Sequence, residues 1–331
     1  MYNTGKYCKS GATPITFWAW IPGINKVVDM FNQTHPKICV QLQNVGAGPP
    51  EYNKLLLDIR AKKGLPDLAE VEYSALPEFE VTHSLVNLAN YGAGKLKPKF
   101  APGFWSLVTK GSAIYAIPGD TGPMGLLVNT AFMKKYNLAI PTTWQQLSQE
   151  AIKLHKAHPK VYLTNFPPNS EIGYLALLEQ AGARPFHFSG NKATYNFQSP
   201  AALKVANYWQ KLLSQHAVDT LNFQSNQSYK AMIGQPSVLF PSFLPMLNST
   251  LLSNSTLPLT GNQHYYVPFI KGASNLPTDW QWGPFNVYER TQQDNALAQV
   301  ANGKMTLVQA MKQVQTKMIN YAQSQGLSAS S

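Results

Sequence analysis

Four tryptophans stand in short segments flanked by turn residues, where they could hold a ligand through the faces of their rings. They form two pairs, Trp18 with Trp20 and Trp280 with Trp282. A sugar ring offers apolar C–H faces with hydroxyls at its edge, so an indole platform beside a few Asp, Glu or Asn acceptors binds it well. For Trp18, Trp20 and Trp282 the sequence leaves ligand contact and core packing equally open. The remaining tryptophans are interpreted as packing residues: Trp105, Trp144 and Trp209.

Two carboxylates could accept hydrogen bonds from such a ligand. Glu72, beside Tyr73, ends a run typical of a strand, and we favour ligand contact for it. Asp120 lies between Gly119 and Gly122, a spacing that favours a plain Asx turn over a hydroxyl acceptor. A glycosidase needs two carboxylates about 5–5.5 or 6.5–9.5 Å apart. Pairing of Glu72 with Asp120 in a glycan-active hydrolase is therefore the alternative function.

Other catalytic and cofactor signatures are missing from the sequence. The run Gly46-Ala47-Gly48 lacks the third glycine of a dinucleotide site, and no P-loop lysine follows it. There is no GxSxG elbow, HExxH motif or clear Cys/His nucleophile. Cys8, in a polar leader, and Cys39, interpreted as a small buried apolar residue, are not spaced for zinc or a redox pair. We expect no catalytic residue, metal or cofactor.

The first 73 residues predict alternating strands and helices. A run rich in β-branched and aromatic residues stops at Pro22-Gly23, and apolar residues from Ile24 to Phe31 then repeat at helical spacing. The predicted elements are a strand at 15–20, a helix from Ile24 to near His35, a strand at 38–45, a helix with its apolar face from Tyr52 to Ile59 that ends at Gly64, and a strand at 68–73. This βαβαβ order is typical of a parallel, doubly wound sheet.

Sheets of this kind bind ligands at the carboxyl ends of their strands. In this chain those ends are Trp18 and Trp20, the glycine loop at 46–48, and Glu72 with Tyr73. We therefore expect these aromatic and polar side chains at one edge of the first sheet. Their chemistry suits a polar organic ligand better than a phosphate.

The rest of the chain predicts a crossing segment and several helices. Two strand-like runs between Ala113 and Asn129 flank a bend rich in Pro and Gly, which suits a crossing between lobes. Thr143 with Gln146, and Thr306 with Gln309, form capping boxes that predict helix starts. The predicted helices are one after Thr143, one at about 200–215 and a final one that stops at Gly326.

Composition and charge narrow the classes of protein. Of 331 residues, 44% are hydrophobic and 13% charged, which excludes a disordered chain and favours two domains. No stretch of about 18 apolar residues is present to span a membrane. The formal net charge is +11, but the lysines are scattered and no nucleic-acid motif accompanies them, so we expect a generic basic surface and no nucleic-acid partner. Asn, Gln, Ser and Thr replace the missing acids, which would suit acid surroundings.

Several short motifs along the chain are informative through their order and spacing. They are Ile15 to Gly23, Gly64 to Leu68, Tyr115 to Met124, Pro141 to Trp144, Trp280 to Pro284 and the helix from Gly303 to Gly326. Each motif is weak by itself, but together they cover nearly the whole chain. In order and spacing the chain resembles the extracellular solute-binding proteins of family 1, which deliver sugars to ABC transporters.

The resemblance implies an α/β fold of the two-lobe, periplasmic-binding-protein-like type II, with a hinge. The implied parts are an N-terminal lobe at 12–120 with a crossing back near 260–300, a second lobe at 121–259 and a C-terminal helix at 304–326. It implies a monomer without catalysis that captures a sugar or oligosaccharide in an interlobe cleft by hinge closure. The closed form would then dock on the membrane permease of an ABC transporter.

The resemblance also implies where the ligand binds and where the protein works. Carried over position by position, it puts Asp120 and Thr121 at the cleft. The expected ligand-binding residues are then Trp18, Trp20, Glu72, Tyr73, Asp120, Thr121 and Trp282. Members of the family are exported and often carry a lipidated cysteine. Cys8 stands roughly there, although Gly5-Lys6-Tyr7 is no lipobox, so an extracellular or periplasmic lipoprotein is expected with lipidation of Cys8 left open.

One departure from the family's pattern concerns the second lobe. Between about Phe223 and Phe240 the chain passes directly to Val238-Leu239-Phe240, which in the family comes much later. We therefore expect the second lobe to lack a segment that includes a Trp-Gly-Pro-type, sugar-contacting loop. A true deletion and an incomplete sequence are the alternatives left open, and a true deletion would put sugar binding in doubt.

Overall fold

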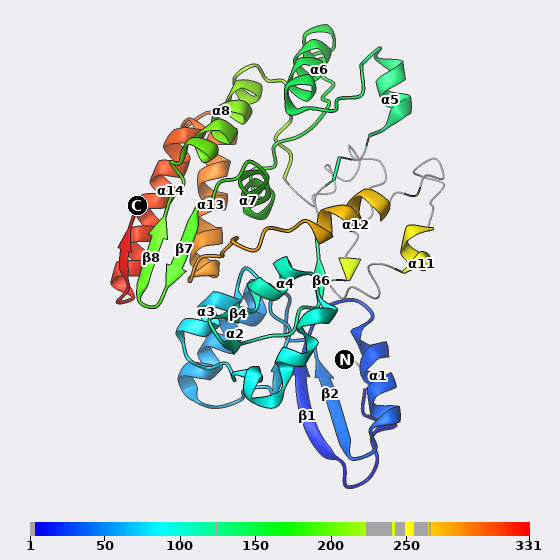
Figure 1. Cartoon of the computed structure of the whole chain (residues 1–331). Coiled ribbons are helices and arrows are strands. Elements are labelled where there is room, and N and C mark those ends of the chain that lie inside the picture. The colour runs from blue at the N-terminus through cyan, green and yellow to red at the C-terminus, as the bar shows by residue number, and fades with distance from the viewer. Residues whose placement is uncertain are drawn as a thin grey trace. The chain divides into compact units, whose positions relative to one another are not determined.

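The chain, drawn in Figure 1, divides into two compact units. The computed structural model describes residues 4–122, 125–126, 128–222, 240–241, 249–254, 264 and 266–331. Unit 1 comprises Met1–Leu85 with Pro284–Val287, and unit 2 comprises Val86–Gly283 with Tyr288–Ser331. The chain thus passes between the units after residues 85, 283 and 287. The lobe boundaries expected from the sequence stay a prediction, and the segment expected to be missing near Phe223 lies outside the described residues.

Unit 1 is built on a three-stranded parallel sheet, as the βαβαβ pattern predicted. Its strands are β1 (Thr13–Trp18), β2 (Ile38–Gln43) and β3 (Leu68–Ala69), in the order β2-β1-β3. Its helices are η1 (Thr4–Tyr7), α1 (Ile24–Thr34), α2 (Pro49–Ala61) and α3 (Leu76–Val81). β3 is shorter than the predicted strand at 68–73, and the chain turns soon after it, where the Ala75 N–H donates to the Glu72 carbonyl at 2.9 Å. α2 ends earlier than predicted, at Lys62 with a left-handed φ of 52°, and not at Gly64.

The two faces of this sheet pack against different helices. Side chains alternate along a strand, so Phe17 and Ala19 face one side and Trp18 the other. α1 covers the first side with Val28, while α2 and α3 cover the second with Tyr52, Leu55 and Phe79, which pack around Trp18.

A buried amide ties α1 to the sheet. Asn32, which is 1% exposed, donates from Nδ2 to the Val40 carbonyl at 3.0 Å and accepts from the Val40 N–H at 2.8 Å. Both groups of Asn32 are thereby satisfied inside the core, as buried amides require.

A disulfide joins Cys8 to Cys39, with a Cα–Cα distance of 5.1 Å. Cys39 is buried as predicted, but it is not a free apolar residue. The sequence leaves Cys8 outside the core, whereas η1 packs against α1 and β2 and brings Cys8 to the second strand. A sulfur bonded in a disulfide cannot also form the thioether of a lipid anchor, so the bond to Cys39 argues against lipidation of Cys8.

Unit 2 combines small sheets with long helices. β10 (Ser328–Ser330), β8 (Lys192–Tyr195) and β7 (Phe186–Ser189) form one sheet; β4 (Thr109–Lys110) pairs with β5 (Ala113–Ile114), and β6 (Asp120–Thr121) with β9 (Phe240–Pro241). The first helices are η2 (Leu88–Tyr91), η3 (Ala93–Lys99), α4 (Pro102–Leu107), α5 (Thr130–Lys135), α6 (Trp144–Ala157), α7 (Glu171–Gln180) and α8 (Pro200–Ser214). Then follow α11 (Thr250–Ser253), α12 (Tyr266–Ser274), α13 (Asn286–Ala301, which begins in unit 1) and α14 (Leu307–Ser324).

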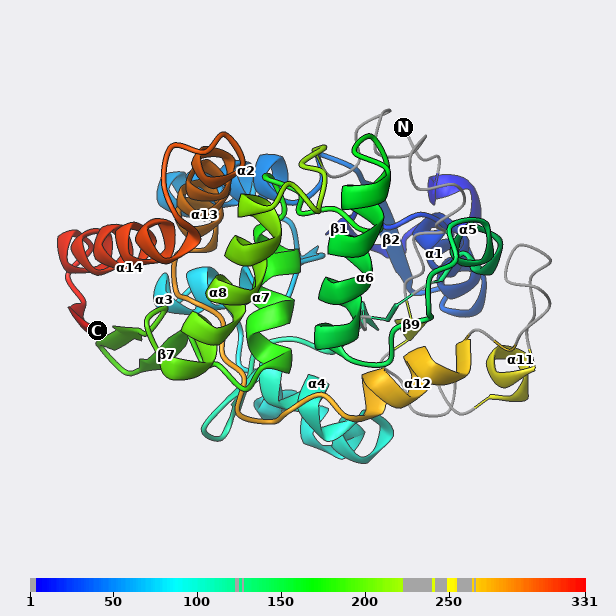
Figure 2. The ribbon, with the colours of Figure 1, turned by 90° about the horizontal axis from the view of Figure 1, so that it is seen from above.

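The helix starts and stops expected in this part of the chain are confirmed. Thr143 caps α6 and Thr306 caps α14, each in a complete capping box with the glutamine three residues on. α14 buries its apolar stripe. The helix lies beside α8, β8 and β10 (Figures 1 and 2). In the part of the chain that the structure describes, none of the helices has the length and apolar character needed to cross a membrane.

Candidate ligand-binding site

Trp18 is buried in the core of unit 1. Its side chain is 3% exposed, and its Nε1 donates to Gln43 Oε1 at 3.1 Å. The ammonium of Lys54 lies 4.5 Å from the centre of the ring. Both its polar edge and a ring face are therefore occupied by unit 1 itself, which favours packing over ligand contact for this tryptophan.

Trp20 is held at the carboxyl end of β1 but is only half-buried. The N–H groups of Trp20 and Ile21 donate to Glu70 Oε2 at 2.9 and 3.0 Å. The Trp20 ring meets the Tyr52 ring edge-on, with centroids 5.9 Å apart. The backbone is thus fixed by a carboxylate while part of the indole stays accessible, which is what a stacking platform requires.

Glu72 lies at the same edge of the sheet, locked to Tyr52. The Tyr52 hydroxyl donates to Glu72 Oε2 at 2.9 Å and accepts from the Glu72 N–H at 2.9 Å. Burial and the charge of Glu72 raise the pKa of the Tyr52 hydroxyl, so it stays a donor. A Cβ on Gly48 would lie 3.7 Å from Glu72 Oε2. The glycine loop and Glu72 are therefore neighbours, as expected from the meeting of strand ends, and Tyr73 follows, half-buried.

Sequence reasoning missed a buried acid, Glu51, in the first turn of α2. Its side chain is fully buried, and neither carboxyl oxygen has a hydrogen-bond partner among the residues described. Burial, together with the charge of Glu70, raises the pKa of Glu51 to about 8. The carboxyl is therefore neutral at pH 7. An acid in a first helical turn is ordinarily a solvated partner of the helix dipole, so no local signal pointed to burial.

Asp120 and Thr121 lie in unit 2, where they form strand β6. Asp120 pairs with Pro241 and Thr121 with Phe240 in an antiparallel ladder. Asp120 is half-buried and stands in extended backbone, not in the turn that its neighbours favoured. The pairing with β9, far along the chain, has no signal in the local sequence.

Trp282 belongs to unit 2 and packs edge-on against Trp280, with ring centroids 5.4 Å apart. Trp280 is 3% exposed, whereas Trp282 is half-buried. The Gln281 side chain between them accepts from the Phe188 N–H at 2.7 Å, which fixes the segment. Nε1 of both tryptophans is buried without an acceptor among the described residues.

The expected site residues divide between the units. Unit 1 holds Trp18, Trp20, Glu72 and Tyr73, and unit 2 holds Asp120, Thr121 and Trp282. The structure brings Trp20 and Glu72 together through Tyr52, a residue that the sequence marked only as part of an apolar helix face. Over the described ranges, no group of three or more His, Cys, Asp or Glu side chains could hold a metal ion.

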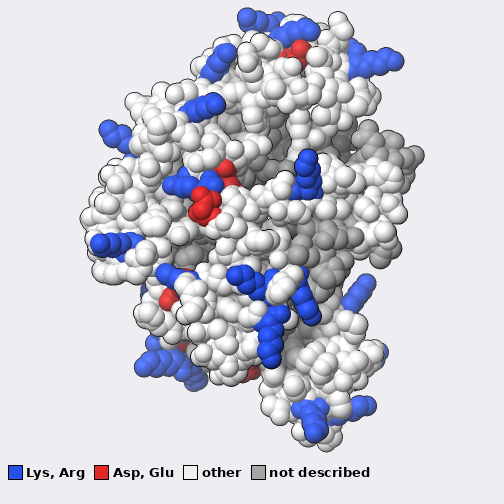
Figure 3. Space-filling view, viewed as in Figure 1, with Lys and Arg blue, Asp and Glu red and all other residues white. Residues whose placement is uncertain are grey.

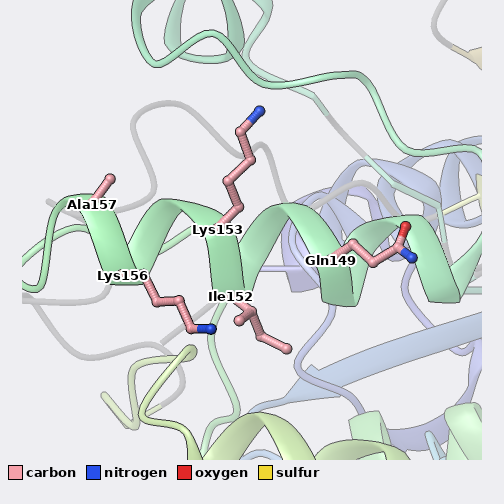
Figure 4. Close-up of a pocket in the computed structure, with 5 residues that line it drawn as sticks. All are labelled: Gln149, Ile152, Lys153, Lys156 and Ala157. Atoms are coloured by element: carbon pink, nitrogen blue, oxygen red, sulfur yellow. The ribbon is translucent and has the colours of Figure 1, made fainter.

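A hollow of about 560 Å³ lies elsewhere, on α6 (Figure 4). Its lining residues all come from that helix: Gln149, Ile152, Lys153, Lys156 and Ala157. Figure 4 shows Lys153 pointing away from Lys156 and Ile152, on the other side of the helix. None of the expected ligand-binding residues lines this hollow, so it is not the candidate site.

Comparisons with known proteins show which family the chain matches. The model of the bacterial extracellular solute-binding protein family matches residues 18–303. An arabinooligosaccharide-binding protein of Halalkalibacterium halodurans is 25% identical over 193 residues, which cover 55% of this chain and 42% of the relative. The match thus spans less than half the length of that relative.

Two solved structures share the fold over 97% of this chain and 100% of their own. One is the binding protein of an ABC transporter from B. animalis subsp. lactis Bl-04 in complex with β-1,6-galactobiose, with a TM-score of 0.80 and 21% identity. The other is the galacto-N-biose-/lacto-N-biose I-binding protein from Bifidobacterium longum in complex with lacto-N-biose, with a TM-score of 0.79 and 21% identity. The α/β, type II fold expected from the sequence is confirmed by this likeness.

Proposed function

Because the chain belongs to the family of bacterial extracellular solute-binding proteins, we propose that it captures a sugar or oligosaccharide and delivers it to the permease of an ABC transporter. The relatives support a carbohydrate ligand, since their names and bound molecules are arabinooligosaccharide, galactobiose and lacto-N-biose. The family places the protein outside the cytoplasm. A disulfide fits that location, because cytoplasmic thiols are kept reduced.

The observation that carries this proposal is the pairing of Trp20 with Glu72 at one sheet edge. Trp20 offers an accessible indole, and Tyr52 holds Glu72 through Oε2. Glu72 Oε1 has no protein partner among the residues described, so it can accept a hydrogen bond from a hydroxyl of the ligand. A ring face beside a fixed acceptor matches the apolar face and polar edge of a sugar.

The other expected residues are assigned roles in the same proposal. Tyr73, Asp120, Thr121 and Trp282 contact the ligand. Trp18 has a packing role instead: its ring is buried in the core of unit 1, where it packs with Tyr52 below the sheet edge that carries Trp20 and Glu72.

The hydrolase alternative is not favoured. The family consists of binding proteins, not enzymes. Glu72, one of its two required carboxylates, already accepts a hydrogen bond from the Tyr52 hydroxyl.

Calorimetry against a panel of mono- and oligosaccharides tests the proposal, with the sugar recovered and analysed afterwards. Trp20→Ala should weaken binding by about five- to 150-fold, the cost of losing one stacking platform by analogy with base stacking. Tyr91→Ala is the matched control, because Tyr91 is 78% exposed in η2 and lies outside the proposed site. Absence of binding by every sugar, unchanged affinity in the Trp20 variant, or hydrolysis of the sugar would overturn the proposal.

A further inference from the structure

Charge is distributed unequally between the surface and the interior of this protein. Among the described residues only two carboxylates are exposed, Asp67 and Asp279. Asp67 accepts from the Thr16 N–H at 2.8 Å, and Asp279 pairs with Arg184 at 2.7 Å. Nearly all described lysines, by contrast, are exposed. The exposed part of the surface therefore carries many more lysines than carboxylates.

One end of unit 2 concentrates these lysines. α5 and α6, with the loop after α6, form a basic cap of five exposed lysines: Lys134, Lys135, Lys153, Lys156 and Lys160. A shared core of Met133, Leu138 and Leu154 joins the two helices. Lys153 also donates to the Asn137 carbonyl at 3.0 Å, which fixes the end of α5 to α6.

The cap holds a single carboxylate, Glu150, which is half-buried and lies 3.6 Å from Lys153. Figure 3 shows the same imbalance, with several blue side chains and one small red area at the top of the view, over α5 and α6. Four of the five lysines are thus left without a carboxylate in the cap.

The chemistry of the cap favours a broad layer of negative charge over one discrete anion. It contains no arginine, the side chain whose planar fork pairs bidentately with a single carboxylate or phosphate. Lysines act as point charges without a fixed direction, and these five are spread over two helices and a loop. Such an arrangement fits a broad layer of negative charge better than one discrete anion.

We propose that the basic cap binds the surface of a lipid bilayer through the phosphates of anionic headgroups. Each lysine near such a surface contributes about a fivefold increase in partitioning, which salt screens beyond about 10 Å at 0.1 M. This contact is independent of the sugar site, because none of its residues is among those assigned to the ligand.

Cosedimentation of the full chain with vesicles tests this inference. Vesicles of phosphatidylglycerol and phosphatidylcholine should bind the protein, vesicles of phosphatidylcholine alone should not, and added salt should weaken the binding. The double variant Lys134→Gln with Lys135→Gln should reduce partitioning about 25-fold. Lys97→Gln with Lys99→Gln, the same charge change on η3, is the matched control and should retain nearly all binding.

Two further experiments distinguish a bilayer surface from other anionic ligands. Inorganic phosphate that displaces the protein at matched ionic strength would indicate a discrete anion site and overturn the proposal. Tighter binding to polyglutamate than to the anionic vesicles would do the same in favour of an acidic polypeptide. An equal loss in the cap and control variants would mean that net charge alone is responsible. A second cap variant, Lys156→Gln with Lys160→Gln, must show a similar loss, and circular dichroism checks that each variant is folded.

Discussion

Replacement of Glu51 by glutamine tests the buried acid in α2. Glutamine has the shape of the neutral carboxyl but cannot ionise. In the folded chain the pKa of Glu51 is raised from 4.5 to about 8, chiefly by burial. Below pH 4.5 the carboxyl is protonated in both folded and unfolded chains, so the raised pKa has no effect on stability there.

Between pH 4.5 and 8 the unfolded chain loses this proton while the folded chain keeps it. The free energy of unfolding therefore falls with rising pH, by about 1.4 kcal/mol for each pH unit. From 4.5 to 7 this amounts to at most about 3.5 kcal/mol. Glu51→Gln should remove that fall, so the variant gains stability relative to the parent as pH rises from 5 to 8.

Urea denaturation at pH 5, 6, 7 and 8 measures the difference, with hydrogen exchange in β1 and β2 as the readout specific to unit 1. Glu150→Gln on α6 is the control for a Glu-to-Gln change elsewhere, and it should leave exchange in β1 and β2 unchanged. Parallel pH curves for the Glu51 variant and the parent would refute the reasoning, because they would mean that the buried carboxyl is not held neutral.

Three further changes test other contacts. Cys8→Ser with Cys39→Ser should lower the free energy of unfolding by about 3.5 kcal/mol, the entropy of a loop spanning 31 residues; an unaltered urea midpoint would contradict this. Asn32→Ala should cost about 2–4 kcal/mol, because it leaves an N–H and a carbonyl of β2 unpaired, and urea denaturation reads the loss. Gly283→Ala should weaken sugar affinity measured by calorimetry, since a Cβ there would collide with the Glu289 carboxylate and displace the segment of the neighbouring tryptophan; native affinity would show that the segment adapts.

Local patterns in the sequence predicted the features that depend on local contacts. The helical spacing of Ile24 to Phe31, the βαβαβ order and the capping boxes at Thr143 and Thr306 are all confirmed. Each depends on residues within one or two turns of one another, or on the alternation of whole elements. The edge that joins Trp20 to Glu72 was predictable in the same way, since parallel strands end together.

Features made by distant partners were not predictable. The burial of Trp18 depends on α2 and α3, which cover its face of the sheet. The bond from Cys8 to Cys39 depends on the packing of η1 against β2, and the strand at Asp120 on a partner at Pro241. The neutrality of Glu51 depends on enclosure, which its position in a helical first turn does not reveal.

The bond between Cys8 and Cys39 also makes the free energy of unfolding of unit 1 depend on whether the surrounding compartment is reducing or oxidising. Reductants in the compartment of synthesis keep both thiols free, so the newly made chain lacks the restriction of the loop and unfolds more easily. A chain that must cross a membrane to reach its place of work benefits from that state. Oxidation on the far side then closes the loop and makes the folded state harder to lose, so the same two sulfurs favour passage before export and persistence after it.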